Sequence, residues 1–146
     1  MRSFRNTLQT GAPAATLLIR LMVSGVFVSE GIQKFLFPSA LGVGRFAQIG
    51  IPAPEIMAPF VGIVEIGCGF LILLGLWTRV AAVPLIVDMG VAIATTKVPI
   101  LLKSGFWSMA HEARTDYSVL LGAIFLLCVG AGSWSLDTWL GSREEK

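Results

Sequence analysis

Charged side chains are scarce in this sequence. The 146 residues include 11 Lys and Arg and 9 Asp and Glu, so 14% of the chain is charged and 55% is hydrophobic. Soluble domains carry about 25% charged residues. Because so few charges cannot cover a water-soluble surface, the composition predicts an integral membrane protein, and the mean hydropathy of +0.79 agrees with this prediction.

Histidine and cysteine are also rare, which excludes several kinds of site. The chain has one histidine, His111, and two cysteines, Cys68 and Cys128. A structural zinc site needs about four such ligands, and a haem held between two histidines needs a second histidine. The net charge of +2, without a cluster of Lys and Arg, is also not typical of a nucleic-acid-binding protein.

Four long apolar segments organise residues 1–146 as one transmembrane domain. They cover residues 14–36, 55–77, 80–96 and 117–135. Each approaches the roughly 20 residues that a helix needs to cross a hydrocarbon core, and lipid requires the backbone to be hydrogen-bonded within each segment. The sequence therefore predicts an all-α integral membrane four-helix bundle with antiparallel up-down topology. The longest connection, residues 97–115, is predicted to lie on the membrane or to lengthen the third helix.

An even number of spans places both termini on one side of the membrane. Cationic residues are enriched in cytoplasmic loops, and the first helix and short loops carry most weight. The side of the termini would hold Arg2, Arg5, Arg79, Arg143 and Lys146, and the other side Lys34, Arg45, Lys97, Lys103 and Arg114. The two sides have equal numbers, so the first helix and the short turn at Arg79 decide, and they favour cytoplasmic termini.

Five charged residues interrupt the first three apolar segments. At 1.5 Å per residue, Arg20 and Asp88 fall at a similar depth in the half nearer the termini. Glu65, Glu30 and Lys34 fall in the other half, where Glu30 and Lys34 also have the i,i+4 spacing of a helical ion pair. We therefore expect opposite charges to be matched in depth on neighbouring helices.

These five charges allow two interpretations. An unpaired charge near the bilayer centre costs about 3 kcal/mol or more, so all five side chains are expected to face the interior and to find partners. In one interpretation they only lock the helices together. In the other they form a ligand or proton site, with Glu65, Arg20 and Lys34 as catalytic residues and Glu30 and Asp88 as binding residues.

The cysteines and the histidine are weaker candidates. Cys68 and Cys128 fall at similar depths in apolar surroundings, where free cysteine usually acts as a small apolar filler. A redox pair would need thiolates, which apolar burial disfavours. Both nevertheless remain candidate binding residues. His111, with Glu112 and Asp116, is interpreted as a solvated loop cluster, so no metal site is predicted.

Small residues recur among the charged ones in a specific order. The first segment carries Arg20, Gly25, Phe27, Gly31 and Lys34. The pattern E-x-G-x-G…G-L-x-T-R extends from Glu65 to Arg79. Asp116 and Tyr117 open the fourth segment, and G-x-G…S-L-D covers residues 130–137. This order resembles that of the DoxX family of small four-helix membrane proteins over residues 14–140. The pattern from Glu65 to Arg79 is the most specific match, and Asp116 stands where the family usually has Glu.

The resemblance implies a role in membrane redox chemistry. The family is named from a subunit of a thiosulfate–quinone oxidising system, and other members are associated with complexes that handle thiol and oxidant stress. It therefore implies a protein of the bacterial inner membrane, with quinone as the cofactor to test and soluble redox enzymes as partners. It also adds Arg79 and Asp116 to the candidate binding residues. We further expect a homo-oligomer.

Three functional hypotheses remain open at this stage. The chain is a component of a membrane redox system acting on quinone or on sulfur and thiol compounds, although it has no ligand set for flavin, haem or an iron–sulfur cluster. Alternatively, it is a small carrier or channel whose interior charges bind a solute. In the third hypothesis it is a membrane scaffold that anchors soluble redox enzymes through residues 97–115.

Overall fold

The computed structural model describes residues 12–143, and these residues form helices without any strand. Arg2, Arg5 and Lys146, which were used to predict the orientation, lie outside the described residues. The helical elements are α2 (Thr16–Leu36), α3 (Val43–Gln48), α4 (Pro54–Leu74), α5 (Thr78–Ala92), η1 (Ile93–Lys97), α6 (Val98–Ser104), α7 (Phe106–Glu112), α8 (Arg114–Val129) and α9 (Leu136–Arg143).

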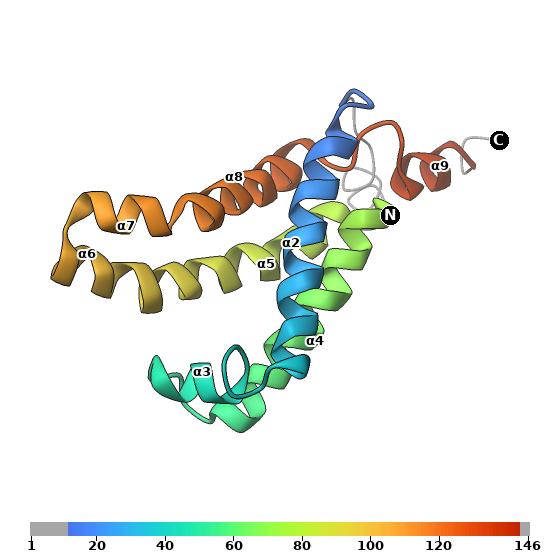
Figure 1. Cartoon of the computed structure of the whole chain (residues 1–146). Coiled ribbons are helices and arrows are strands. Elements are labelled where there is room, and N and C mark those ends of the chain that lie inside the picture. The colour runs from blue at the N-terminus through green and yellow to red at the C-terminus, as the bar shows by residue number, and fades with distance from the viewer. Residues whose placement is uncertain (1–11, 144–146) are drawn as a thin grey trace.

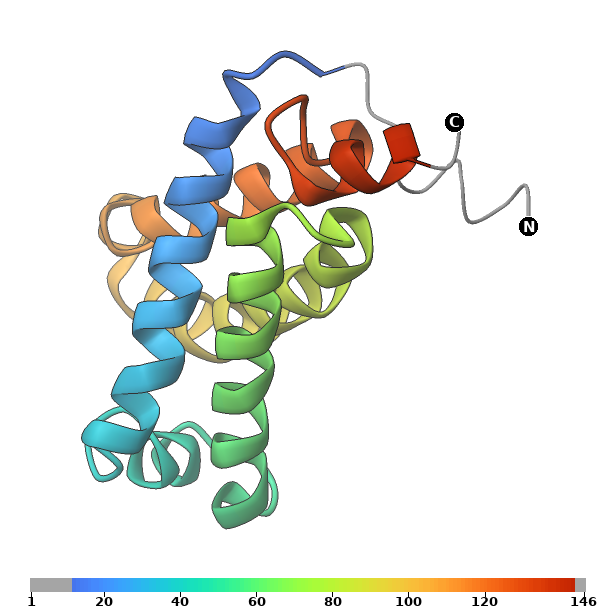
Figure 2. The ribbon, with the colours of Figure 1, turned by 90° about the vertical axis from the view of Figure 1, so that its right-hand side faces the viewer.

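The long helices are arranged as two hairpins. The first hairpin consists of α2 and α4, with α3 in the connection between them (Figure 1). The second consists of the continuous helix α5–η1–α6 and, running back beside it, α7 and α8. The two hairpins cross each other instead of standing side by side (Figures 1 and 2). The all-α prediction is therefore confirmed. The predicted four-helix bundle with antiparallel up-down topology is not confirmed, because the described helices form two crossed hairpins.

Three helices of the described chain are long and apolar enough to cross a membrane. They are Thr16–Leu36, Pro54–Leu74 and Thr78–Ser104. The last continues well beyond the predicted end at residue 96, because the π-helical segment η1 joins α5 to α6 without a break. Helix α8 has 16 residues, and α7 precedes it along nearly the same line (Figure 1).

Several predicted boundaries were wrong, and glycines explain two of the errors. Helix α4 ends at Leu74 instead of residue 77, because Gly75 has a φ of +67°. Helix α8 ends at Val129 instead of residue 135, because Gly130 has a φ of +90°. Positive φ is accessible to glycine and ends a helix. Residues 97–115 are mostly helical, with the turn at Gly105, and the short helix α3 was not predicted.

Small residues allow α2 and α4 to pack closely. A Cβ atom added to Gly31 of α2 would lie 2.7 Å from Cγ1 of Ile66 and 2.8 Å from the backbone oxygen of Gly62. Close approach through glycine is the usual way in which membrane helices associate, since lipid gives no hydrophobic driving force between them. The hydrophobic core contains the fully buried side chains of Val23, Phe27, Ile72, Leu85 and Leu126.

Replacing Gly31 by valine should therefore push α2 and α4 apart. We expect Gly31→Val to destabilise the protein by about 1–3 kcal/mol, the usual cost of overpacking a close contact. Gly67→Val is the matched control, because a Cβ atom at Gly67 on α4 meets nothing within 4 Å. The midpoint of thermal unfolding in detergent measures both changes, and equal shifts for the two variants would contradict this account of the packing.

Candidate functional site

An ion pair joins the two helices of the first hairpin. The ammonium Nζ of Lys34, on α2, lies 2.6 Å from the carboxylate Oε2 of Glu65, on α4. The two side chains are only 11% and 4% exposed. Asp88, on α5 of the second hairpin, is half-buried and lies in hydrogen-bonding range of the Glu65 carboxyl group. We call Lys34, Glu65 and Asp88 the Lys34 cluster, and it joins three helices.

The turn between α4 and α5 explains why Glu65 meets Asp88. Glu65 lies nine residues before the end of α4 at Leu74, and Asp88 lies ten residues after the start of α5 at Thr78. At 1.5 Å per residue, both carboxyl groups are about 14–15 Å from the shared turn. The sequence predicts that the second helix ends at residue 77 and that the third begins at residue 80. This error shifted Asp88 to the depth of Arg20, and that predicted grouping was wrong.

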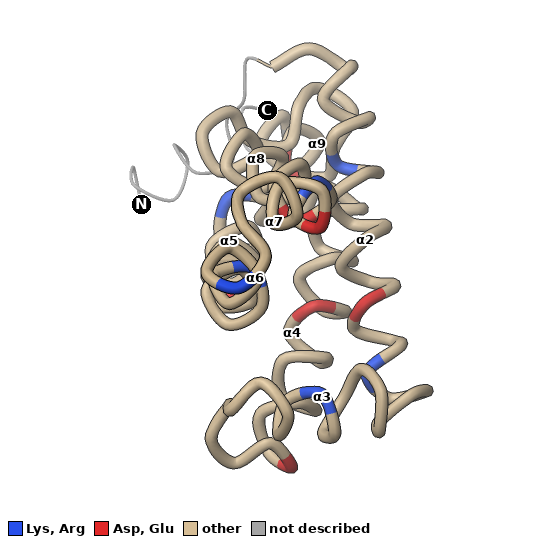
Figure 3. The backbone as a smooth tube through the Cα atoms, turned by 60° about the vertical axis from the view of Figure 1, so that its left-hand side comes forward, with Lys and Arg blue, Asp and Glu red and all other residues tan. Residues whose placement is uncertain are grey.

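The composition of the Lys34 cluster determines which protonation states suit a membrane. A carboxylate only accepts hydrogen bonds, so a hydrogen bond between the carboxyl groups of Glu65 and Asp88 requires one proton. With that proton, one carboxylate balances the ammonium of Lys34 and the cluster is neutral. Without it, the cluster carries one net negative charge in a largely apolar part of the protein. Few other charges interrupt α2 and α4 (Figure 3).

Arg20 lies near the opposite end of α2 and makes a different set of contacts. Its Nε donates to the carbonyl of Ile72 at 2.8 Å and its Nη2 to that of Leu73 at 2.5 Å. Its Nη1 donates to the carbonyls of Trp134 at 2.5 Å and of Ala131 at 3.3 Å. The arginine is 2% exposed. It therefore connects α2, the end of α4 and the segment after α8. Arg20 was expected to act together with Glu65 and Lys34, but its hydrogen bonds are to these backbone carbonyls.

Asp137 completes this arrangement at the start of α5. Its Oδ1 accepts from the backbone N–H of Trp77 at 2.7 Å, and its Oδ2 accepts from that of Thr78 at 3.2 Å. The N–H of Asp137 donates to the carbonyl of Gly75. Burial raises the pKa of Asp137 above its usual value, while these N–H groups and Arg20 act in the opposite direction. Together, Arg20 and Asp137 form what we call the clasp.

The clasp explains two features of the G-L-x-T-R motif. Trp77 has a φ of +48°, a left-handed conformation that is rare for a bulky residue and that its hydrogen bond to Asp137 helps to hold. Gly75 must be glycine, because a Cβ atom there would lie 2.7 Å from Cζ of Arg20 and 2.6 Å from Cβ of Ser135. The contact of Asp137 with α5 could not be predicted from sequence spacing, because Asp137 lies 59 residues after Thr78 along the chain.

The remaining charged candidates lie apart from the Lys34 cluster. Glu30 is exposed, so its predicted pairing with Lys34 is replaced by the contact of Lys34 with Glu65. Arg79 donates to the backbone oxygens of Cys128 and Val129 at 3.4 and 3.3 Å. Asp116, at the start of α8, forms an ion pair with Lys97 of η1, with 3.1 Å between Oδ2 and Nζ. Lys97 was not among the predicted site residues.

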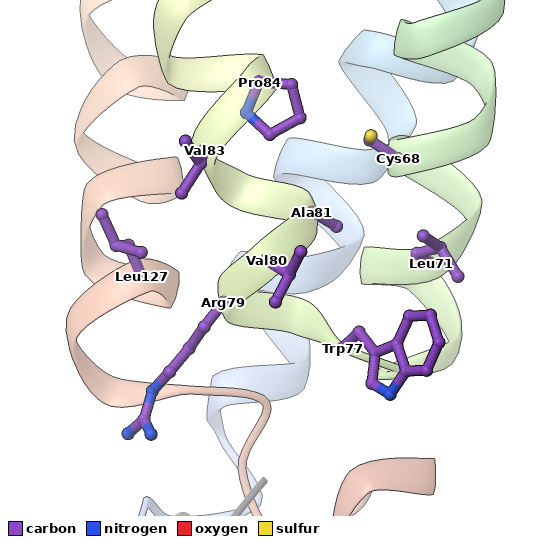
Figure 4. Close-up of a pocket in the computed structure, with 9 residues that line it drawn as sticks. All are labelled: Cys68, Leu71, Trp77, Arg79, Val80, Ala81, Val83, Pro84 and Leu127. Atoms are coloured by element: carbon purple, nitrogen blue, oxygen red, sulfur yellow. The ribbon is translucent and has the colours of Figure 1, made fainter. Parts of the chain in front are cut away.

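The cysteines lie on different helices and both are free thiols. Cys68 is half-buried on α4 and Cys128 is exposed on α8. Cys68 contributes to an open surface pocket of about 580 Å³ with almost entirely apolar walls (Figure 4). The other lining residues are Leu71, Trp77, Arg79, Val80, Ala81, Val83, Pro84 and Leu127. The pocket does not include the Lys34 cluster.

In the described part of the chain, the acidic, histidine and cysteine side chains do not gather into a metal site. His111 contacts Arg114 on the exposed surface, with Nη1 of the arginine 2.8 Å from Nε2 of the imidazole. Within residues 12–143, no group of three or more His, Cys, Asp and Glu is placed to hold a metal ion. The Lys34 cluster is therefore the main candidate site in the described part of the chain.

Long apolar helices and a buried ionisable cluster that joins three of them define a helical integral membrane protein. The family model for DoxX matches residues 15–98, which include all three residues of the Lys34 cluster. The chain belongs to the DoxX family. No solved structure matches it significantly.

Three relatives cover nearly the whole chain. The uncharacterized membrane protein Rv3486 of Mycobacterium tuberculosis is 54% identical, over 97% of this chain and 90% of its own length. CatD of Bacillus subtilis, provisionally named an oxidoreductase, is 31% identical over 86% of each chain. An uncharacterized protein of Haemophilus influenzae is 33% identical, over 90% of this chain and 95% of its own length.

The geometry of the Lys34 cluster predicts strong coupling between Lys34 and Glu65. We expect Lys34→Met to destabilise the protein by about 3–5 kcal/mol, because it leaves a buried carboxylate without its cation. Adding Glu65→Leu removes that carboxylate, so the double variant should recover much of the loss. Thermal unfolding in detergent of both single variants and the double variant measures this coupling, and purely additive effects would count against it.

The clasp predicts that Arg20 acts on stability. We expect Arg20→Met to destabilise the protein by about 3 kcal/mol or more, because each hydrogen bond to a charged group contributes about 1.5–3 kcal/mol. Proteolysis should then release the segment after α8 sooner than in the wild type. Lys103→Met, on the exposed surface of α6, is the control. A normal unfolding midpoint for Arg20→Met would show that the clasp contributes little.

Proposed function

We propose that this protein is a component of a redox system in the bacterial inner membrane, and that the Lys34 cluster is its proton-handling site. The observation that carries the proposal is the contact of two carboxyl groups and one ammonium group inside a membrane protein. Ionisable residues are costly in lipid and often belong to proton relays. The provisional name of CatD as an oxidoreductase supports a redox role, as does the relation of the family name to quinone-linked thiosulfate oxidation.

The proton inventory of the cluster suits this role. The neutral form contains one proton shared between Glu65 and Asp88, and loss of that proton creates a net negative charge. Lys34 stabilises this charge through its contact with Glu65, so the cost of releasing the proton stays moderate. A substrate that takes up a proton beside the cluster would receive it from the two carboxyl groups.

The donors of the cluster fit the oxygen of a quinone ring. The ammonium of Lys34 has three N–H donors, and within residues 12–143 it makes one hydrogen bond, to Glu65. Lys34 can therefore also donate to a carbonyl oxygen, while Glu65 and Asp88 hold the proton nearby. A bound quinone would supply the two-electron chemistry, for which the family resemblance suggests a sulfur or thiol compound as the source of electrons.

The same proposal includes a topology. We place α7 and α8 together as a fourth crossing, with both termini on the cytoplasmic side. The α4–α5 turn and α9 then lie on the cytoplasmic side, and α3 and the α6–α7 turn lie on the other side. Soluble redox enzymes are the proposed partners, and the protein acts as a homo-oligomer.

Glu65→Gln tests the proposed site, because glutamine keeps the shape of the side chain but does not carry an ionisable proton. We expect proteoliposomes of the wild type to reduce a short-chain ubiquinone with thiosulfate or dithiothreitol as the electron donor, above the rate of empty vesicles. Glu65→Gln should reduce that rate at least tenfold, a change of about 1.4 kcal/mol in the barrier. Quinol formation is followed by absorbance.

Glu55→Gln is the matched control, because Glu55 is exposed at the start of the same helix. It should retain the rate of the wild type, and thermal unfolding should show that both variants are folded. Equal rates for Glu65→Gln and the wild type would refute the proposed site. Movement of a solute into the vesicles without quinone reduction would instead support the carrier hypothesis.

A further inference from the structure

The apolar pocket that contains Cys68 lies along the two helices that carry the carboxyl groups of the Lys34 cluster. Cys68 and Leu71 line it from α4, and Ala81 and Pro84 are among the residues that line it from α5. Trp77 marks its end at the α4–α5 turn, and Cys68 and Pro84 are the lining residues of the two helices that lie furthest from that turn (Figure 4). We call this space the α4–α5 pocket.

The Lys34 cluster lies one helical turn beyond the far end of the α4–α5 pocket. Glu65 comes three residues before Cys68 on α4, and Asp88 comes four residues after Pro84 on α5. The rise of 1.5 Å per residue places Glu65 and Asp88 about 4.5 Å and about 6 Å further along their helices. Residues three or four apart lie on the same side of a helix. The side of the α4–α5 hairpin that carries the pocket therefore also carries the two carboxyl groups.

The size, walls and opening of the α4–α5 pocket suit an apolar ligand that comes from the membrane. Its volume of about 580 Å³ lies within the roughly 300–1,000 Å³ of pockets that hold small molecules. Such pockets combine apolar walls with a few polar groups that orient the ligand, and here the nearest such groups are Glu65 and Asp88. On the rim, Val80 and Val83 are 57% and 48% exposed, so the pocket opens to the surroundings of the helices, which are lipid.

A quinone has the two chemical features that this arrangement can recognise. Its ring and tail are apolar, so they match the walls of the pocket and reach it through lipid. Its carbonyl oxygen accepts hydrogen bonds, and the Lys34 cluster beyond the far end holds both a proton and N–H donors. The acyl chain of a phospholipid matches only the walls, and a small hydrophilic thiol compound matches only the cluster. The combination of pocket and cluster therefore favours a quinone over either of them.

From this arrangement we infer that the α4–α5 pocket binds the ring of a membrane quinone, with one carbonyl oxygen directed toward Glu65 and Asp88 and the tail leaving through the open side into lipid. The inference rests on the proposed function and deepens it, because it locates the site of the substrate. Cys68 then contributes a small side chain between the ring and the cluster, and its thiol takes no part in the chemistry. Figure 4 shows this thiol extending from α4 toward α5, so a larger side chain at this position would fill the far end of the pocket.

Binding of a tritiated short-chain ubiquinone to the purified full-length protein in detergent tests the pocket without any turnover. Specific binding is the part of the signal that an excess of unlabelled ubiquinone displaces. We expect the wild type to bind saturably, and Cys68→Phe to raise the Kd at least tenfold because the phenyl ring occupies the far end of the pocket. Cys128→Phe is the matched control, because Cys128 is exposed on α8 and does not line the pocket. It should bind as the wild type does.

Val80→Trp fills the pocket from its exposed rim, where added bulk does not disturb the core. It should raise the Kd at least fivefold, and it keeps the inference testable if Cys68→Phe does not fold. The midpoint of thermal unfolding in detergent shows which variants are folded. In the proteoliposome assay, the folded variants should raise the KM for ubiquinone and leave kcat within twofold, because the Lys34 cluster is unchanged. A role of Cys68 or Val80 in stability alone would not change KM in this way.

The outcomes separate this inference from the proposed function. If the filled variants weaken binding but the wild type does not reduce ubiquinone, the pocket is upheld and the redox role is refuted. If the wild type reduces ubiquinone and the filled variants keep its KM and Kd, the pocket is refuted and the redox role stands. The inference is also overturned if the wild type shows no saturable binding. Equal displacement of the label by phospholipid and by ubiquinone would overturn it too, because the pocket would then hold an acyl chain.

Discussion

The hydrogen-bonded ion pair between Lys34 and Glu65 is the contact around which this protein is organised. Its two charges belong to different helices and lie in a chain with few charged residues, so neither group can be left unpaired at low cost. The pair fixes the register of α2 against α4, and the contact of Glu65 with Asp88 adds α5. In the function proposed above, the same three groups hold a proton.

A second set of polar contacts, the clasp, has a different character. Arg20 uses its guanidinium group on backbone carbonyls, and Asp137 uses its carboxylate on backbone N–H groups. The last carbonyl groups of one helix and the first N–H groups of the next have no hydrogen-bond partner within their own helix. The clasp therefore satisfies the α4–α5 turn and attaches the C-terminal segment to it. Gly75 and Thr78 of the family motif thus serve this turn, while Glu65 of the same motif belongs to the Lys34 cluster.

The glycines of α2 differ in what surrounds them, according to the face of the helix on which they lie. Gly31 faces α4 and permits the contact that brings Lys34 to Glu65. Gly25 faces away from the rest of the described chain, and a Cβ atom there would meet nothing within 4 Å. Packing within the described residues therefore does not require its small size.

Local sequence determined the class of protein, the helical nature of the apolar segments and the depth shared by Lys34 and Glu65. These features follow from composition and from a constant rise per residue, so no knowledge of the partners is needed. The tertiary structure alone decided the crossing of the hairpins, the contact of Asp88 with Glu65 and the backbone partners of Arg20. They depend on where Gly75 and Gly130 end their helices, because a few residues of error at a helix end carry a charged side chain to a different level. A carbonyl group, unlike a charge, is present at every residue, so the sequence could not indicate which carbonyls Arg20 would find.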